Sequence, residues 1–405
     1  MLGKKRKRRG GWRNPFSKWI AGKSKAAPAR KAPADAVTID FPLFIAVLAL
    51  VIMGLIIMYS SSAFWGEYYH RDSLYFFKRQ SVFAAFGFAT MLAIAKYYRK
   101  FADRINPTGL LVCTWILLVG VLFCRPVANV HRWIPVGPVR LQPSELAKIS
   151  LIFFLARYLD ANKSRLAKSY KALAYPVLMT LITLGLIAVE PDLGTPALLF
   201  LVSAALLFVG GMSMKILLAG LAAAVPVAAY QLIKYEYRIK RLLVFLSPEQ
   251  NISSSGYQLH QSFLAIGAGG WLGAGLGASK MKLLYLPEPH TDFIFAIMAE
   301  ELGLLRVLCV VGLFCFVIYR GLKIARTASS LSGSMTALGI TLMLALQSFY
   351  NMSMSTGLVP TKGIPLPFFS YGGSSILSTL VMMGILLGIS ARSAEKKPAG
   401  ERGSK

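Results

Sequence analysis

The sequence predicts an all-α, polytopic integral membrane protein with about ten transmembrane helices. Hydrophobic residues make up 55% of its 405 residues, only 15% are charged, and the mean hydropathy is +0.56. Soluble domains typically carry about 25% charged residues. Apolar runs of spanning or nearly spanning length recur along almost the whole chain after residue 40. Such a series of runs is typical of a bundle of membrane-crossing helices.

Ten apolar runs are the expected spans, because a helix satisfies all of its backbone polar groups within lipid. They cover residues 41–60, 80–95, 108–124, 145–159, 173–189, 196–211, 214–233, 293–319, 334–350 and 373–391. The fourth and sixth runs are short, and the eighth is long enough to include an interfacial turn. Together they predict one membrane domain over residues 41–392.

Two tails flank this domain. Residues 1–40 include KKRKRR at 4–9 and no acidic residue before Asp35, in a chain of formal net charge +28. A basic segment ahead of a first span is typical of a cytoplasmic anchor to anionic lipid. We therefore expect residues 1–40 to be disordered and to contact the bilayer, and we expect no nucleic-acid binding. Residues 393–405 are the expected cytoplasmic C-terminal tail.

The positive-inside rule predicts that both termini are cytoplasmic. In this orientation, Lys- and Arg-rich segments lie inside at 97–104, 157–171 and 319–326. The large outer loop is then 234–292, between spans seven and eight. Three further polar segments share the outer face, namely 129–145, 190–195 and 360–375. Every motif-like segment therefore lies on one side of the membrane.

The outer loop contains two unusual segments. KYEYRIKR at 234–241 is either an amphipathic interfacial helix or an extension of span seven. AIGAGGWLGAGLGAS at 265–279 has no preceding strand and no GK[ST] ending, so we do not expect a nucleotide site there. Its glycines favour close backbone packing. The four cysteines lie in apolar runs and are expected to be small core residues.

Acidic residues gather at the outer ends of spans. In LPEPHTDFIF, Asp292 either caps the next helix or serves as a catalytic carboxylate. Glu288 could be a second carboxylate and His290 an orienting group, or both could be loop residues. Glu190 and Asp192 in EPDLGT either cap helices or contribute to a shared polar site or a divalent cation site.

Basic residues enter span four in VRLQPSELAKIS. Lys148 either pairs with Glu145 on one helix face or joins Arg140 in holding an anionic headgroup. In span eight we expect Glu300, Glu301 and Arg306 to pair internally. The proline-rich PTKGIPLPFFSYGGSS at 360–375, which includes Lys362, is expected to form a rigid wall of one site.

The ordered motifs resemble the SEDS family (shape, elongation, division and sporulation), which includes FtsW, RodA and SpoVE. The resemblance covers residues 41–392. It rests on EPDLGT, GYQLHQSFLAIGAGG, LPEPHTDFIFAIMAEELG and PTKGIPLPFFSYGGSS. The KLLYLPEPHTDF form at 282–293 and the PTKG opening look like the division-specific FtsW branch.

This resemblance implies a peptidoglycan glycosyltransferase that polymerises lipid II at the outer face of the bacterial cytoplasmic (inner) membrane, at the division septum. It implies a class B penicillin-binding protein and other division membrane proteins as partners. The family's essential aspartate falls on Asp292, which would be the general base. The basic pair falls on Arg140 and Lys148, which would contact the diphosphate of lipid II.

Other site residues follow from the same motifs. The expected substrate contacts include, beyond Arg140 and Lys148, the residues Glu190, Asp192, Gln258, Gln261, Glu288, His290, Lys362 and Ser370. A divalent cation, Mg²⁺ or Mn²⁺, is the one cofactor considered, with Asp292, Glu288 and Asp192 as candidate ligands. No His/Cys spacing supports zinc.

Two other functions remain open from the sequence. A lipid II transporter would place polar residues through the membrane and on both faces, whereas here they gather near the outer end. A non-catalytic scaffold would keep its function when the outer acids are substituted.

Overall fold

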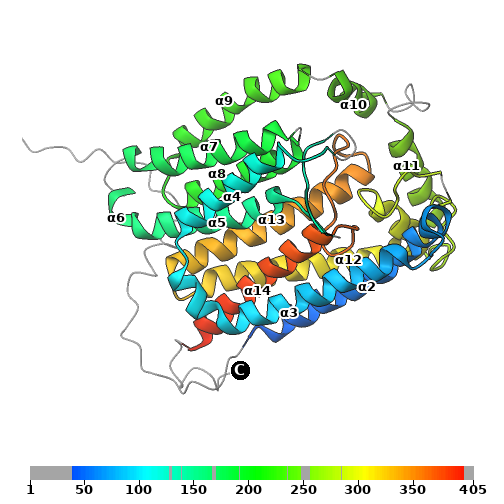
Figure 1. Ribbon diagram of the computed structural model, residues 1–405, viewed down its shortest axis with the longest axis horizontal. Helices are drawn as coiled ribbons and strands as arrows, with labels where there is room; N and C mark the ends of the chain where they lie inside the picture. Colours follow the sequence, from blue (N-terminus) through cyan, green and yellow to red (C-terminus); the bar gives the residue numbers. More distant parts are fainter. Residues whose placement is uncertain are drawn as a thin grey trace, which may run out of the picture.

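The computed structural model describes residues 39–395, except 127–129, 138, 167–169, 191, 235, 248–255 and 284. Most of the expected tails at 1–40 and 393–405 lies outside these residues, so the disordered-anchor interpretation stays a prediction. The described chain is an all-α bundle with one short β-hairpin. This architecture confirms the predicted fold class (Figure 1).

Each of the ten predicted runs lies in a helix. These helices are α2 (Phe41–His70), α3 (Tyr75–Arg104), α4 (Pro107–Val121), α5 (Pro143–Ala161), α7 (Ala174–Val189), α8 (Gly194–Val209), α9 (Met214–Ile233), α12 (Ile294–Thr327), α13 (Leu331–Ser355) and α14 (Gly373–Glu395). Among the described residues, seven helices are long and apolar enough to cross a bilayer, and α4 and α8 are shorter apolar helices. The number of crossings and their direction stay predictions.

Short elements connect the long helices. They are the antiparallel strands β1 (Ile134–Val136) and β2 (Val139–Leu141), and the helices α6 (Lys163–Leu166), η2 (Tyr170–Leu173), α10 (Glu236–Leu246) and α11 (Tyr257–Gly269). The helix α10 is separate from α9, so KYEYRIKR belongs largely to a helix of its own. Figure 1 shows α10 and α11 at the opposite end of the molecule from α6.

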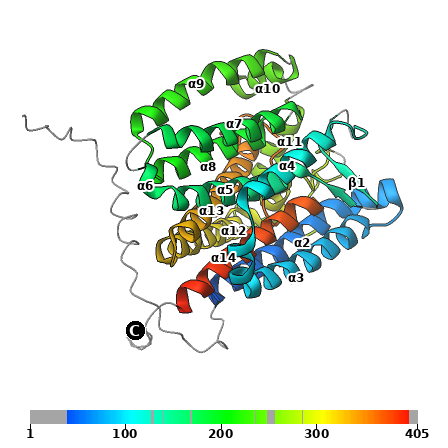
Figure 2. The ribbon, with the colours of Figure 1, turned by 60° about the vertical axis from the view of Figure 1, so that its left-hand side comes forward.

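The helices α13 and α14 form the centre of the bundle. Helix α13 packs against α12, α5 and α8, while α14 packs most extensively against α3. Helix α9 has no buried residue among those described, and it lies at the edge of the bundle against α8 and α10 (Figures 1 and 2). A helix that exposes apolar residues on every side fits a lipid environment.

The glycine-rich segment 265–279 packs against α12 at the point where Gly303 interrupts the helix. At Gly303 the backbone has φ 72° and ψ 172°, which favours glycine. On either side of the break, Ala274 N–H donates to Glu300 O at 2.9 Å and Leu304 N–H donates to Gly270 O at 2.9 Å. A Cβ on Gly303 would lie 2.1 Å from Gly273 N. The glycines therefore provide the close backbone packing that the sequence predicts.

The cysteine prediction is wrong. Cys113, Cys309 and Cys315 are exposed and Cys124 is half-buried; all four lie in the part of the chain that the structure describes, and all are free thiols. In a membrane bundle an apolar run continues around the lipid-facing side of a helix as well as its core side. The position of a cysteine within an apolar run therefore does not show whether its side chain faces lipid or the core.

Candidate functional site

Asp292 lies immediately before α12, and its backbone is held from α13. Asn351, which is fully buried, donates through Nδ2 to Asp292 O and to Ile364 O, both at 2.8 Å. Among the described residues, no side chain caps the start of α12, and no hydrogen bond reaches the carboxylate of Asp292. The half-buried carboxylate is therefore not used for capping.

The proline-rich segment forms the wall beside this carboxylate, as predicted. A Cβ on Gly363 would lie 3.1 Å from Asp292 Oδ2, so glycine leaves room for the carboxylate. Ser370 Oγ donates to Thr291 O at 2.6 Å and accepts from Leu366 N–H at 2.8 Å. Ser370 is buried, and its hydroxyl already donates one hydrogen bond and accepts another. Ser370 therefore joins the two segments, and its predicted role as a substrate contact stays a prediction.

The surroundings make Asp292 a usable base near neutral pH. Burial and, to a smaller extent, the neighbouring charge of Glu288 raise the pKa of its carboxyl to about 6, although Arg241 and Arg132 act against this rise. A general base is most effective when its pKa lies near the working pH. Asp292 therefore has the basicity that proton abstraction requires.

Glu288 is exposed and has a left-handed backbone, with φ 45°. Its carbonyl accepts from Thr291 N–H at 3.1 Å and from Thr291 Oγ1 at 2.8 Å, which closes a tight turn before Asp292. A non-glycine residue held at positive φ is uncommon and is seen most often in turns or at functional sites. Glu288 is thus positioned to influence Asp292 through its charge.

His290 does not have the polar role that the sequence suggests. Its ring packs among Phe76, Tyr371 and Trp65, with ring centroids 4.5, 5.6 and 6.2 Å away. Among the described residues, Nδ1 has no hydrogen-bond partner, and burial lowers the pKa of the imidazole to about 4. His290 is therefore a neutral, buried aromatic residue, and its side chain is not exposed to a substrate.

The two acids of EPDLGT have different environments. Asp192 Oδ1 accepts from Gly194 N–H at 2.9 Å and Oδ2 accepts from Thr195 Oγ1 at 2.8 Å, so Asp192 caps α8. Glu190 is fully buried, and neither side-chain oxygen has a hydrogen-bond partner among the described residues. Burial, with the added charge of Asp192, raises the pKa of Glu190 to about 8. Glu190 is therefore neutral at physiological pH.

Lys148 forms the internal pair with Glu145, whereas Arg140 is exposed. Lys148 Nζ donates to Glu145 Oε1 at 2.7 Å and to Gln347 Oε1 at 3.3 Å, and Lys148 is 2% exposed. Gln347 Nε2 in turn donates to Pro365 O at 3.0 Å. This chain of contacts positions the proline-rich wall, so an outside headgroup could reach Lys148 only by breaking the pair.

Arg140 belongs to the β-hairpin, which is fixed to the start of α14. Ser374 Oγ donates to Arg140 O at 2.8 Å and accepts from Gln142 N–H at 3.2 Å. The side chain of Arg140 is exposed. A ligand that used Arg140 and Lys148 together would have to reach an exposed hairpin and a buried helix face at once.

Three other predicted contacts remain open to a ligand. Lys362 is half-buried beside the wall, and burial lowers the pKa of its amine to about 8. Gln258 and Gln261 are half-buried on α11, one turn apart. Ser262, directly after Gln261, links α11 to α13 because its Oγ donates to Ser355 O at 2.8 Å.

The metal prediction does not fit this arrangement. Within the described ranges, no three His, Cys, Asp or Glu side chains converge as a metal site. Asp192 is occupied as a helix cap, and divalent cations in proteins prefer several oxygen ligands at once. Asp292, Glu288 and Asp192 therefore do not form a metal centre in this structure.

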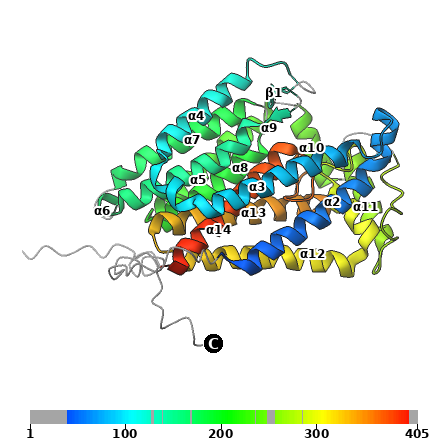
Figure 3. The same ribbon diagram turned by 60° about the horizontal axis from the view of Figure 1, so that its bottom comes forward.

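A buried ion pair anchors the loop that carries Asp292. Lys282 Nζ donates to Glu301 Oε1 at 2.9 Å, to Ser60 Oγ at 3.0 Å and to Gly277 O at 2.7 Å. Glu300 accepts from Ser279 Oγ at 2.5 Å and from Lys280 N–H at 2.8 Å. Of the internal pairing predicted for span eight, only Glu301 forms an ion pair in the part of the chain that the structure describes, and its partner Lys282 lies in the outer loop. Arg306 pairs with neither acid: it is exposed, and its Nη1 donates to Leu272 O at 3.0 Å. Helix α11 of the same loop packs against α12 (Figure 3).

Sequence reasoning missed three arginines whose charges act on the site, namely Arg132, Arg238 and Arg241. Arg132 Nε donates to Glu190 O at 3.3 Å, and Arg238 Nη1 donates to Gln231 O at 2.6 Å. Arg132, Arg238 and Arg241 all act electrostatically on Lys362. The motif-like segment 129–145 and the basic amphipathic segment 234–241 contain these residues, but neither segment indicates that their charges act on the same lysine.

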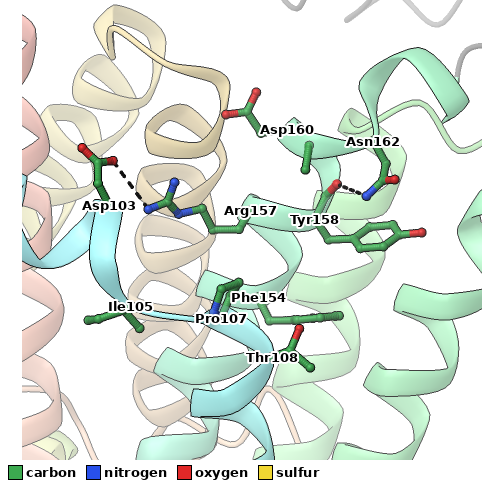
Figure 4. Close-up of a pocket in the computed structure, with 10 residues that line it drawn as sticks. Asp103, Ile105, Pro107, Thr108, Phe154, Arg157, Tyr158, Asp160 and Asn162 are labelled. Carbon is green, nitrogen blue, oxygen red and sulfur yellow. Dashed lines mark hydrogen bonds and ion pairs between the residues drawn. The ribbon is translucent and has the colours of Figure 1, made fainter.

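A separate cavity of about 580 Å³ lies away from these residues. It is formed where α3 leads into α4 and where α5 ends, and Arg157 Nη2 lies 3.7 Å from Asp103 Oδ1 at its rim (Figure 4). Asp160, also in its lining, accepts from Ser332 N–H at 3.1 Å. This cavity shares no residue with the site around Asp292.

Known proteins are similar to this chain over almost the whole membrane domain. The sequence profile of the cell cycle protein family of FtsW, RodA and SpoVE matches residues 41–395. A probable peptidoglycan glycosyltransferase FtsW from Halorhodospira halophila is 39% identical over 373 residues, covering 90% of this chain and 94% of the relative. A protein of the same description from Trichlorobacter lovleyi is 38% identical over 356 residues, covering 87% and 93%.

Solved structures show the same fold. A structure of a peptidoglycan synthase complex that coordinates polymerisation and crosslinking contains a chain of 28% identity, with a TM-score of 0.72, covering 87% of this chain and 98% of that chain. The rod shape determining protein RodA of Thermus thermophilus is 25% identical, with a TM-score of 0.64 and coverage of 89% and 98%. The chain described here is thus a multi-pass membrane protein of the same architecture.

Proposed function

This chain belongs to the FtsW, RodA and SpoVE family of cell cycle proteins, and on that premise we propose that it is a peptidoglycan glycosyltransferase of cell division. The substrate is lipid II, a disaccharide-peptide joined through a diphosphate to a polyprenyl chain. The enzyme extends glycan strands at the outer face of the bacterial inner membrane, at the division septum. Relatives of 38–39% identity described as probable peptidoglycan glycosyltransferases support the activity.

The single observation that carries the proposal is the carboxylate of Asp292. It lies between two loop segments, is free of the helix cap, and has a pKa of about 6. A carboxylate with this pKa is largely ionised at neutral pH and can accept a proton from a sugar hydroxyl. Gly363 leaves the space in which the carboxylate sits.

The reaction then proceeds as a single displacement. Asp292 takes the proton from the acceptor sugar hydroxyl, and the hydroxyl oxygen forms a bond to the anomeric carbon of the donor sugar. The bond between that carbon and the diphosphate oxygen breaks, and the polyprenyl diphosphate leaves with the electron pair. The transition state gathers negative charge on the leaving diphosphate, where cationic side chains stabilise it.

The partner proposed for this enzyme is a class B penicillin-binding protein, which cross-links the strands, together with other division membrane proteins. The similarity to a chain from a synthase complex that coordinates polymerisation and crosslinking supports a transpeptidase partner. The bilayer is the third partner, because the polyprenyl tail must enter the site from lipid.

The direct test is polymerisation by the purified protein with its transpeptidase partner. Fluorescent lipid II is supplied, and glycan polymer is resolved on a gel for the wild type and for Asp292→Ala. We expect polymer from the wild type and none from Asp292→Ala, with both proteins equally folded by thermal unfolding. Normal polymerisation by Asp292→Ala would remove this residue from the role of base.

The same preparation separates the two rival functions. A lipid II transporter would move labelled lipid II across vesicles without making polymer. A non-catalytic scaffold would make no polymer, and Asp292→Ala would still support division in cells depleted of the wild type. Either result would overturn the glycosyltransferase proposal.

A further inference from the structure

We propose that the cavity where α3 leads into α4 binds the phosphoethanolamine headgroup of a phospholipid from the leaflet at this end of the bundle. Among the described residues that line it, the cavity offers one cation and two carboxylates, which match a phosphate and an ammonium group. The positive-inside rule makes this the inner leaflet. The proposal goes beyond the glycosyltransferase reaction and does not depend on it.

The cavity lies at the level where membrane-spanning helices begin and end. Its lining comes from the end of α3, the start of α4 and the last turns of α5. One predicted apolar run begins here at residue 108, and another ends here at residue 159. Phospholipid headgroups occupy the boundary of the hydrocarbon core. A lipid headgroup can therefore reach the cavity without leaving the bilayer.

The lining changes from apolar to polar along the axis of α5. Phe154 is buried and lies deepest in the span, Arg157 follows about one turn later, and Asp160 lies nearest the end of the helix. Ile105 and Pro107 lie level with Phe154, on the apolar side of the cavity (Figure 4). A phospholipid has the same order, because its glycerol and acyl chains lie on the apolar side of its headgroup.

Arg157 supplies the positive charge of the lining. Its Nη2 lies 3.7 Å from Asp103 Oδ1, and its Cζ lies 5.4 Å from the centre of the Phe153 ring. A separation of 3.7 Å is longer than a hydrogen bond, and the side chain of Arg157 is still 28% exposed. A guanidinium group binds phosphate oxygens in pairs through its planar fork. Arg157 is thus positioned to bind the phosphate of the headgroup.

Two carboxylates lie on either side of Arg157 (Figure 4). Asp103 is exposed near the end of α3, and Asp160 is half-buried on α5. Asp160 Oδ2 accepts from Ser332 N–H at 3.1 Å, which holds this carboxylate between α5 and α13. A carboxylate has about four acceptor positions. One hydrogen bond from Ser332 therefore leaves Asp160 able to accept from an ammonium group as well.

The arrangement of charge favours a zwitterion over a simple anion or cation. A headgroup with a phosphate alone would bring its negative charge beside two carboxylates, which repel it. A cation alone would be repelled by Arg157. Phosphoethanolamine contains both charges in one group, so each can meet an opposite charge. The cavity of about 580 Å³ also lies within the usual range of small-molecule sites.

The test measures which lipids the full-length protein retains. The purified protein is placed in nanodiscs of phosphatidylethanolamine and phosphatidylglycerol in equal amounts, and bound lipids are counted by native mass spectrometry. The wild type should retain phosphatidylethanolamine in preference. Arg157→Ala and Asp160→Asn should each reduce this retention by about 10- to 100-fold, since each removes one charge-assisted contact. Arg104→Ala is the matched control, because Arg104 is exposed next to Asp103 and is not part of the lining.

Thermal unfolding in each lipid shows that the variants are folded and gives a second readout. Phosphatidylethanolamine should raise the unfolding temperature of the wild type above its value in phosphatidylglycerol, and Arg157→Ala and Asp160→Asn should lose this difference. Asp160→Asn keeps an acceptor for Ser332 N–H, so its fold should be preserved. Equal retention of both lipids by the wild type, a preference for phosphatidylglycerol, or unchanged retention in both variants would each overturn the proposal.

Discussion

Gly363 lies against the carboxylate of Asp292, so that a Cβ at this position would be 3.1 Å from Oδ2. Asn351 ties the two segments together through the carbonyls of Asp292 and Ile364. The reacting carboxylate and the wall beside it are therefore one rigid unit, fixed from α13. The position of the base is thus sensitive to changes that never touch the carboxylate itself.

The first prediction concerns the space at Gly363. Gly363→Ala should reduce polymerisation by about 10- to 100-fold, since the added methyl group displaces the carboxylate by a fraction of an ångström. Lipid II binding and thermal stability should stay close to those of the wild type. Gly220→Ala in α9 is the control, because a Cβ there meets nothing within 4 Å. Equal activity in Gly363→Ala and the wild type would show that the carboxylate does not need this space.

The second prediction concerns the pH dependence of catalysis. Asp292 acts as a base only when ionised, so the rate at saturating lipid II should fall as pH drops below about 6. Glu288→Gln removes a negative charge that raises the pKa of Asp292, so its acid limb should move to lower pH. Rates measured from pH 5 to 8 for both proteins check this. If the acid limb of the pH–rate profile lies at the same pH in Glu288→Gln as in the wild type, a group other than Asp292 sets that limb.

The third prediction concerns Glu190 and stability. Its folded pKa of about 8 lies above the ordinary value of 4.5, so the folded protein holds a proton that the unfolded chain releases between these two values. Stability should therefore decline as pH rises from about 4.5 to 8. Glu190→Gln, which cannot ionise, should flatten this slope in thermal unfolding scans at constant detergent and salt. A slope as steep as that of the wild type would contradict the assignment.

The fourth prediction concerns the ion pair that holds the outer loop. Lys282→Met leaves the fully buried Glu301 without its cation, which should cost about 3–5 kcal/mol and lower the unfolding temperature markedly. The double variant Lys282→Met with Glu301→Leu should recover part of that loss.

The exposed pair of Lys78 and Asp72 serves as the comparison for this test. Its ammonium and carboxylate groups are 2.8 Å apart but well exposed to solvent. Lys78→Ala should therefore leave the unfolding temperature close to that of the wild type. If Lys282→Met unfolds at the same temperature as Lys78→Ala, the buried pair does not anchor the loop.

Several features could be predicted from the order of residues alone. The all-α membrane fold follows from the apolar runs, because a chain in lipid must satisfy its backbone hydrogen bonds within helices. The family resemblance and the choice of Asp292 follow from motifs that are contiguous in the sequence. The capping role of Asp192 is local as well, since it involves residues two and three positions away.

Other features depend on contacts between segments far apart in the chain. The predicted polar role of His290 is wrong because Trp65 and Phe76 surround its ring, and nothing near residue 290 indicates these neighbours. Ser370 is occupied by Thr291 for the same reason. Side-chain availability depends on what packs against a residue in three dimensions, which a local motif does not contain.

The sequence by itself therefore determined the class of the protein and its family, and it led to Asp292 as the proposed base, because composition and short ordered motifs carry this information. Only the tertiary structure decided that Lys148 is buried in a pair with Glu145 beside Gln347, and that His290 is buried among aromatic rings and neutral. The physical reason is that charge interactions depend on distance and burial. Both are set when segments more than a hundred residues apart fold against one another.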